Sequence, residues 1–185
     1  MTDEFVYRFV PAKGEGAPPL LLLHGTGGDE YDLLQLGAMV SPQSALLSPR
    51  GRVLENGMPR FFRRLTEGVF DEDDVRRRAF ELADFVDDAR RRHGIDRPVA
   101  LGYSNGANIA AAVTLLRPGT FAGAALLRAM VPLSDPPHPD LSGLPVLMVS
   151  GKIDPIVPES NSAKLAAVLR DAGADVSLQV LPVGH

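Results

Sequence analysis

Cysteine is absent from this chain of 185 residues. Its absence excludes disulfide bonds, thiolate metal ligands and a cysteine nucleophile. Serine, histidine and the carboxylates remain as the side chains that could carry catalysis. Only four histidines are present, so few side chains could serve as a general base near neutral pH.

The chain also lacks long apolar runs and an excess of positive charge. No apolar run approaches the roughly 18 to 20 residues that span a bilayer, and residues 1–5 lack the basic and apolar regions of a signal peptide. We therefore expect a cytoplasmic protein without stable membrane insertion. The formal net charge of −4 is spread over mixed acidic and basic residues, so no basic face is expected to bind nucleic acid.

The composition that is present predicts a single domain over residues 1–185, because a 45% hydrophobic content suffices for one core. Short aliphatic segments bounded by turn formers are predicted to be strands. The strong candidates are residues 20–23, 99–102, 124–130 and 146–150. The weaker candidates are residues 6–10, 45–48 and 176–181.

Helices are predicted between these strands. The clearest covers residues 73–93, where apolar residues recur at spacings of three and four and so share one face. Acidic residues near its start and basic residues near its end complement the helix dipole, and Gly94 is placed to end it. The other predicted helices are residues 31–39, 105–116 and 158–172.

Strands that alternate with helices predict a three-layer α/β domain, with a mostly parallel sheet and helices on both faces. The interval 130–145 is too short for a large lid domain. Residues 49–68 and 132–143 show no clear periodicity. Loops of that length are uncommon unless functional, so both are expected to form pocket walls.

The segment 102–106 reads Gly-Tyr-Ser-Asn-Gly and satisfies the pattern G-x-S-x-G. This pattern places a serine on a sharp, strained turn from strand to helix, and glycines are needed around it. An apolar strand leads into the segment and an alanine-rich helix leads out, as such a nucleophile elbow requires. Ser104 is therefore the candidate nucleophile, although a glycine-rich turn without chemical importance would have the same five residues.

A serine hydroxyl needs a base to accept its proton and an acid to orient that base, in the chain order serine, acid, histidine. His185 follows the last predicted strand and a glycine, whereas His138 lies in a proline-rich loop. His185 is the better candidate. His24, at a strand end, and His93, at a helix end, have ordinary structural explanations.

Asp154 is the favoured acid, because it lies just past the end of the strong strand 146–150. Catalytic groups in open parallel sheets gather at that edge. Asp135 and Asp140 are competitors from a less ordered loop. Any aspartate in such a turn could instead serve only the turn itself.

The segment 24–29, His-Gly-Thr-Gly-Gly-Asp, supplies a glycine-rich turn after the first strong strand. Its backbone N–H groups, together with that of Asn105, could form an oxyanion hole. A dinucleotide fingerprint beginning at Gly25 would need glycine at position 30, which is Glu30, and no phosphate-binding Gly-Lys-Ser/Thr ending is present. Both nucleotide-binding interpretations fail.

These motifs together resemble the phospholipase/carboxylesterase family of the α/β-hydrolase superfamily, and the resemblance covers nearly the whole chain. The family includes acyl-protein thioesterases, small bacterial esterases and hydroquinone-associated hydrolases. The matching motifs are residues 24–29, Ser-Pro-Arg-Gly at 48–51, Arg-Phe-Phe at 60–62, residues 102–107, Gly151 with Asp-Pro-Ile-Val-Pro at 154–158, and Gly-His at 184–185. The Arg-Phe-Phe motif looks closest to the hydroquinone-associated branch.

The resemblance implies Ser104 as nucleophile, Asp154 as orienting acid and His185 as base. It implies Thr26 and Asn105 as backbone donors to the oxyanion, no cofactor, no metal, and often a homodimer. Family members usually continue into a final helix after this histidine. We therefore expect that helix to be missing beyond His185.

The resulting hypothesis is a serine hydrolase that cleaves small carboxylic esters through an acyl-enzyme. The alternatives are a thioesterase or lysophospholipase of the same family, an acyl transferase or C–C hydrolase, and a catalytically idle hydrolase fold that serves as a binding protein. An apolar pocket could be lined by aromatic and aliphatic side chains, although core packing is expected for at least half of them. These side chains are Phe61, Phe62, Leu65 and Phe70.

Overall fold

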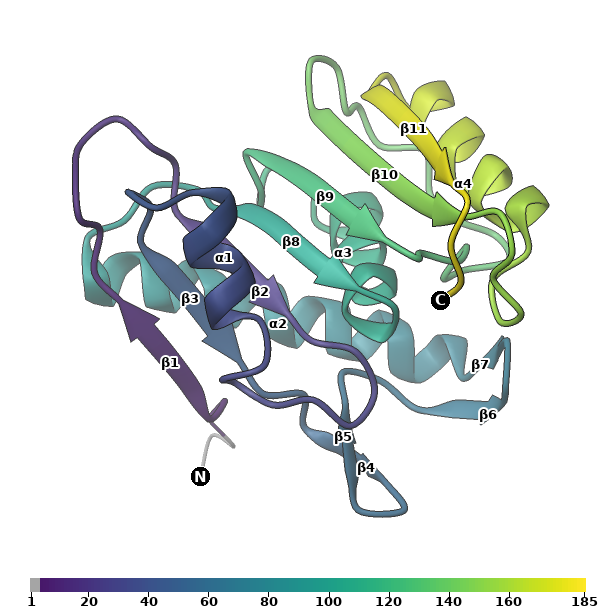
Figure 1. The fold of residues 1–185 in the computed structure, drawn as a ribbon, viewed down its shortest axis with the longest axis horizontal. Coiled ribbons are helices and arrows are strands. Elements are labelled where there is room, and N and C mark those ends of the chain that lie inside the picture. Colours follow the sequence, from purple (N-terminus) through teal and green to yellow (C-terminus); the bar gives the residue numbers. More distant parts are fainter. Residues whose placement is uncertain (1–3) are drawn as a thin grey trace.

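The protein, described by a computed structural model over residues 4–185, is built on a seven-stranded sheet (Figure 1). The strand order is β1-β3-β2-β8-β9-β10-β11. The strands are β1 (Tyr7–Val10), β2 (Leu20–Leu23), β3 (Leu46–Pro49), β8 (Val99–Tyr103), β9 (Gly123–Leu127), β10 (Pro145–Gly151) and β11 (Asp175–Leu181). All seven predicted strands are present, with shifts at their ends.

Only the edge strand β1 runs antiparallel to its neighbour β3, and every other pair in this sheet is parallel. The prediction of a mostly parallel sheet is therefore confirmed. The largest shift concerns the predicted strand 124–130, which ends at Leu127 because Arg128 takes a positive φ of 59° and turns the chain away. Parallel strands bring their carboxyl ends to one edge of the sheet, where the candidate site lies.

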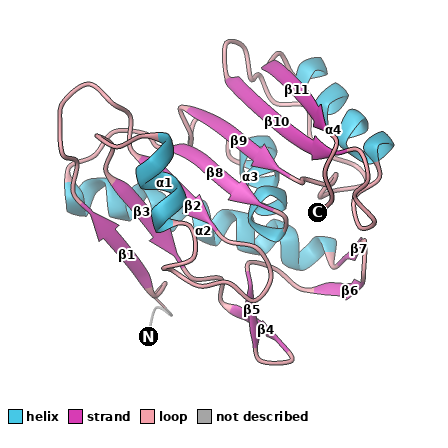
Figure 2. Ribbon diagram, viewed as in Figure 1, coloured by secondary structure: helices cyan, strands magenta, loops and turns pink. Residues whose placement is uncertain are grey.

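Helices cover both faces of the sheet unequally (Figure 2). They are α1 (Leu34–Val40), α2 (Glu72–His93), α3 (Asn105–Leu116) and α4 (Glu159–Asp171). The short α1 packs on one face, whereas α2, α3 and α4 share a core cluster on the other. The predicted helix 31–39 begins three residues later than expected, because residues 30–33 form a turn.

The four leucines of β2 show how the two faces are filled. Leu21 and Leu23 point into the large cluster with α2 and α3, and Leu20 and Leu22 into the smaller cluster beside α1. All four are buried, which is why this strand reads as an unbroken apolar run rather than an alternating one. The strand preceding the glycine-rich turn is thus held from both sides.

The aperiodic segment 49–68 contains most of two small hairpins rather than an open loop. The first joins β4 (Val53–Glu55) to β5 (Met58–Arg60), and the second joins β6 (Arg64–Thr66) to β7 (Val69–Phe70). Strands of two or three residues are too short to show an alternating pattern, so the sequence did not reveal them. The hairpins lie beside the carboxyl edge of the main sheet (Figure 1).

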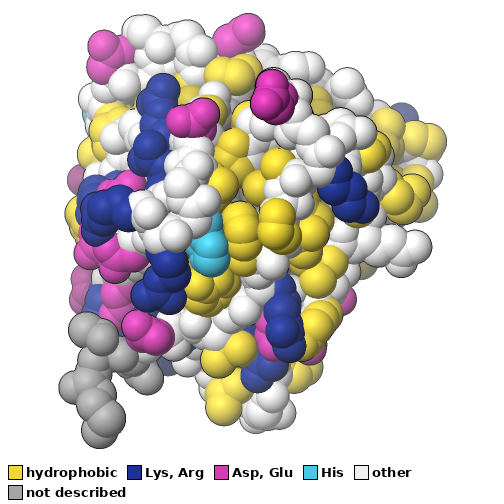
Figure 3. All heavy atoms as spheres, turned by 90° about the vertical axis from the view of Figure 1, so that its left-hand side faces the viewer, with side chains coloured by type: hydrophobic (Ala, Val, Ile, Leu, Met, Phe, Trp, Pro, Cys, Tyr) yellow, Lys and Arg dark blue, Asp and Glu magenta, His cyan; other side chains and the backbone are white. Residues whose placement is uncertain are grey.

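Exposed hydrophobic side chains lie at the β1 edge of the molecule. Figure 3 shows hydrophobic side chains gathered on this face among charged ones. Val6, before β1, and Met39 and Val40 of α1 are each more than half exposed. None of these residues lines the cleft described below. Within residues 4–185, no helix is both long and apolar enough to cross a bilayer.

Candidate active site

Ser104 lies on the tight turn between β8 and α3. Its backbone has φ 52° and ψ −114°, a left-handed conformation that is strained for any residue but glycine. A Cβ on Gly106 would lie 2.0 Å from the carbonyl oxygen of Leu23, and one on Gly102 would lie 2.6 Å from that of Gly106. Both glycines of the motif are therefore sterically required, and α3 starts directly against the end of β2.

The structure brings the other two predicted residues to this serine. His185 Nε2 lies 2.8 Å from Ser104 Oγ, and His185 Nδ1 lies 2.8 Å from Asp154 Oδ2. A carboxylate only accepts hydrogen bonds, so Nδ1 carries the proton and Nε2 is left to accept the serine hydroxyl. The three residues come from loops after β8, β10 and β11.

The Asp154 carboxylate is ionised and accepts three hydrogen bonds. Its side chain is fully buried, and its Oδ1 accepts hydrogen bonds from the backbone N–H groups of Ile156 at 2.8 Å and Val157 at 2.9 Å. Burial raises the pKa of this carboxyl, but the hydrogen bonds from Val157, His185 and Ile156 outweigh it, so the pKa lies below its usual range. The carboxylate can therefore orient His185 without competing for its proton.

Thr26 and Asn105, the predicted oxyanion donors, both line the cleft that contains Ser104. Among the residues that the structure describes, neither of their backbone N–H groups donates to another protein atom. Gly27 and Gly28 beside Thr26 do donate, to Pro59 and Gly25. Two free donors next to a nucleophile are what an oxyanion hole requires.

The cleft has a volume of about 320 Å³, at the small end of the range for ligand sites. Its floor carries Ser104, and Arg60, Arg64 and Glu67 give its walls a polar, charged character. Apolar contact is available from a few side chains. These are Phe70, Tyr103, Met130, Ile156 and Val157.

The hairpin segment 49–68 contributes to the cleft wall, as expected, but the segment 132–143 does not. The segment is absent from this cleft because Leu133 and Leu141 are buried in the core, while Ser134 is bound to Glu72 of α2. Its residues 140–143 line a separate cavity instead. The segment therefore packs on the face of the sheet that α2 covers and does not contribute to the cleft with Ser104.

Of the four side chains that could have lined an apolar pocket, only Phe70 lines the cleft. Phe61 and Phe62 are buried in the core. Leu65 is 67% exposed and does not line the cleft. The expectation that at least half of these side chains pack in the core is therefore confirmed, and only one of them supplies apolar surface to the cleft.

Comparison with known proteins places the chain in a family. The sequence profile of the phospholipase/carboxylesterase family matches residues 7–185. The chain belongs to this family. Among curated proteins it is 50% identical over 180 residues to MhqD of Bacillus subtilis (strain 168), which is named as a hydrolase; the match covers 96% of this chain and 90% of that protein.

Solved structures of other hydrolases share the fold. A carboxylesterase from Bacillus cereus is 44% identical, with a TM-score of 0.96 over 100% of this chain and 88% of the other. A carboxylesterase from Mesorhizobium loti is 35% identical, with a TM-score of 0.93 over 100% and 90%. This phospholipase/carboxylesterase family member is thus a hydrolase with an α/β-hydrolase fold, and residues 4–185 contain no large lid domain.

Arg128 is a residue of this family member that sequence reasoning missed. Its Nε donates to the carbonyl of Gly184 at 2.9 Å, directly before His185, and its Nη1 donates to Val149 at 3.1 Å. The positive φ of Arg128 strains its backbone. It also turns the chain at the end of β9, and the side chain reaches the carbonyl of Gly184. No local sequence pattern signals this role, because Gly184 is 56 residues away.

The remaining candidates for the acid and the base lie elsewhere. His24 is buried, with Nδ1 bonded to the carbonyl of Gly25 at 2.6 Å and Nε2 accepting from Gly51 at 2.9 Å. Burial lowers the pKa of His24, although the Gly25 carbonyl opposes the shift, so a neutral imidazole locks two loops together. His138 is exposed, and neither it nor Asp135 or Asp140 lines the cleft with Ser104.

We predict that Gly106→Ala prevents the elbow from forming. The added methyl group would meet the backbone carbonyl oxygens of Leu23 and His24 at 2.0 and 2.6 Å, so α3 or β2 must shift. The free energy of unfolding should fall by at least about 2 kcal/mol, measured by urea denaturation. Gly14→Ala is the control, since its Cβ would meet only the movable side chain of Gln43. Equal effects of the two substitutions would contradict the prediction.

We predict that Asp154 contributes to stability only above acidic pH. The folded pKa of this carboxyl is depressed below its ordinary value of 3.8, so its contribution is complete above that value and is lost as pH falls through the folded pKa. The unfolding free energies of the wild type and Asp154→Asn should therefore differ near neutral pH and converge as the pH is lowered through the folded pKa of Asp154. A difference that stays constant with pH would show that the negative charge of Asp154 does not stabilise the folded protein.

Proposed function

We propose that this hydrolase cleaves carboxylic esters with Ser104 as nucleophile, His185 as general base and Asp154 as the orienting acid. The observation that carries the proposal is the unbroken chain of hydrogen bonds from the Asp154 carboxylate through His185 to Ser104 Oγ, each 2.8 Å long. A serine hydroxyl is a poor nucleophile at neutral pH unless such a base accepts its proton. The strained backbone of Ser104 supports the same role, since strain of this kind collects at functional sites.

In the proposed acylation step, Ser104 Oγ attacks the ester carbonyl carbon and its proton passes to His185 Nε2. The carbonyl oxygen becomes an oxyanion, which the backbone N–H groups of Thr26 and Asn105 stabilise. The intermediate collapses as the bond to the alcohol oxygen breaks, and His185 returns the proton to the leaving alcohol. Asp154 stabilises the imidazolium that exists between these two transfers.

Deacylation repeats the sequence with water. His185 Nε2 removes a proton from a water molecule, whose oxygen attacks the acyl carbon. The bond between that carbon and Ser104 Oγ then breaks, and the serine regains its proton from His185. The carboxylic acid leaves and the enzyme is restored, so the reaction needs no cofactor.

The size and polarity of the cleft favour a substrate with a short acyl group. A volume of about 320 Å³ with charged walls has little room for a long alkyl chain. The related protein YahD, 31% identical with a TM-score of 0.91 over 98% of this chain and 91% of its own, has been solved with malic acid. A small polar carboxylic acid is the kind of product that the present cleft would also accommodate.

We predict that a fluorophosphonate probe labels the wild type and fails to label Ser104→Ala. The probe reacts only with an activated serine, so it tests the nucleophile independently of the true substrate. Ser150→Ala is a suitable control, because Ser150 is buried in β10 outside the cleft. An unlabelled but folded wild type would favour an idle, binding-only hydrolase fold.

We predict that kcat/KM for p-nitrophenyl esters falls once the acyl chain outgrows the cleft. Acetate and butyrate esters should be turned over at least about tenfold more efficiently than octanoate, equivalent to about 1.4 kcal/mol of transition-state binding. The corresponding thioesters, measured in parallel, separate an esterase from a thioesterase. A preference for long acyl chains would instead support the lysophospholipase alternative.

A further inference from the structure

Residues 59–63, which comprise the end of β5 and the link to β6, form a segment that we call the strap. It crosses the glycine-rich turn at two points. The N–H of Gly27 donates to the carbonyl of Pro59 at 2.9 Å. Arg60 Nη1 donates to Thr26 Oγ1 at 2.5 Å. Two successive strap residues therefore hold the turn that carries one of the two proposed oxyanion donors.

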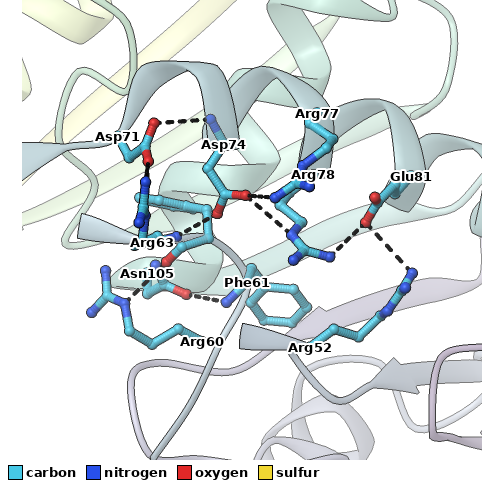
Figure 4. Close-up of polar contacts among 11 residues, drawn as sticks. Arg52, Arg60, Phe61, Arg63, Asp71, Asp74, Arg77, Arg78, Glu81 and Asn105 are labelled. Carbon is cyan, nitrogen blue, oxygen red and sulfur yellow. Dashed lines mark hydrogen bonds and ion pairs between the residues drawn. The ribbon is translucent and has the colours of Figure 1, made fainter. Parts of the chain in front are cut away.

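The next strap residue holds the other donor. The N–H of Phe61 donates to Asn105 Oδ1 at 2.7 Å, and both residues are buried (Figure 4). The bond fixes the side chain of Asn105 and with it the first residue of α3. Residues 59, 60 and 61 thus connect the loop after β2 to the start of α3, which are far apart in the sequence.

The strap is itself firmly anchored. The N–H of Arg63 donates to Asp74 Oδ2 at 2.7 Å, on the first turn of α2 (Figure 4). The Phe62 ring is fully buried in the core. A Cβ on Gly51 would lie 2.4 Å from the Arg60 carbonyl carbon, so the backbone at Gly51 also packs directly against the strap. Because the strap is bound to α2 and packed in the core, it restricts the movement of the two donor residues that it contacts.

Arg60 is an unusual residue to find at this position. It is only 2% exposed, and its neighbouring carboxylate Glu55 lies 3.7 Å away and is shared with Arg64. Burial, with the nearby charge of Arg64, lowers the pKa of Arg60 to about 10 against the opposing effect of Glu55. A buried cation that is incompletely paired costs free energy. Packing alone would be served better by an apolar side chain.

We infer that the strap pre-organises the oxyanion hole, with Arg60 acting as a positioning residue through the hydroxyl of Thr26. The inference rests on the proposed function, because it concerns the same tetrahedral intermediate. Catalysis by backbone donors depends on their being aimed before the charge develops, and small misplacements are costly. Arg60 acts on the Thr26 side chain, so its effect should appear in the chemical step rather than in substrate binding.

The test compares Thr26→Val and Thr26→Ser, which both retain the backbone N–H but differ in the hydroxyl that Arg60 holds. Thr26→Val should lower kcat for p-nitrophenyl acetate by at least about tenfold with KM changed less than about twofold, and Thr26→Ser should stay near the wild type. Arg60→Met should lower kcat similarly. The double variant Arg60→Met/Thr26→Val should be no worse than either single variant, because both remove the same bond.

Arg91→Met is the matched control, since its side chain pairs with Asp88 on α2, outside both the strap and the cleft. It should leave kcat within about twofold of the wild type. The inference is overturned if Thr26→Val keeps full kcat or if Thr26→Ser falls as far as Thr26→Val. It is also overturned if Arg91→Met falls as far as Arg60→Met, or if the losses of Arg60→Met and Thr26→Val multiply in the double variant. Should Arg60→Met not fold, the two Thr26 variants decide alone. Fluorophosphonate labelling of the wild type distinguishes failure of this inference from failure of the proposed function. If the wild type is not labelled, the proposed function itself is refuted.

Discussion

The close approach of α3 to the carboxyl end of β2 is the constraint on which the site depends. Gly106 lies so near the Leu23 carbonyl that no side chain fits between them. This contact sets where α3 begins, forces Ser104 into its left-handed conformation, and brings the N–H of Asn105 beside the turn that carries Thr26. Ser104 and the proposed donors are therefore placed by backbone packing at the centre of the sheet.

The other two residues of the site are supplied from the other half of the sheet. Asp154 follows β10 and His185 follows β11, and the parallel pairing of these strands brings both loops to the edge where β8 ends. A Cβ on Gly151 would lie 2.5 Å from the Gly184 carbonyl oxygen, and Arg128 binds the same carbonyl. The position of the His185 imidazole is thus fixed both by the backbone at Gly184 and by the hydrogen bond to Asp154. Both contacts keep Nε2 within hydrogen-bond distance of Ser104 Oγ.

Polar groups that are costly to bury gather around this edge. The carboxylate of Glu30 is buried and pairs with both Arg50 Nε and Nη2, at 2.6 and 2.8 Å. The hydrogen bond from Arg50, acting against burial, holds the pKa of Glu30 below its usual range. Together with His24 between Gly25 and Gly51, this pair ties the turn after β2 to the loop after β3. Such groups stabilise one loop arrangement because breaking either pair would leave a buried polar atom unsatisfied.

The sequence by itself determined the α/β class, the seven strands of the sheet, the four helices and the three residues that meet at the site. It could do so because runs such as 20–23 and patterns such as G-x-S-x-G are local, and local sterics dictate the turn they form. Only the tertiary structure decided which loops line the cleft, because burial of Leu133 and Leu141 removed one expected wall and no periodicity foretells such packing. The contacts of Arg60 with Thr26 and of Arg128 with Gly184 were likewise invisible, since they join residues 34 and 56 positions apart that meet only when the sheet has assembled.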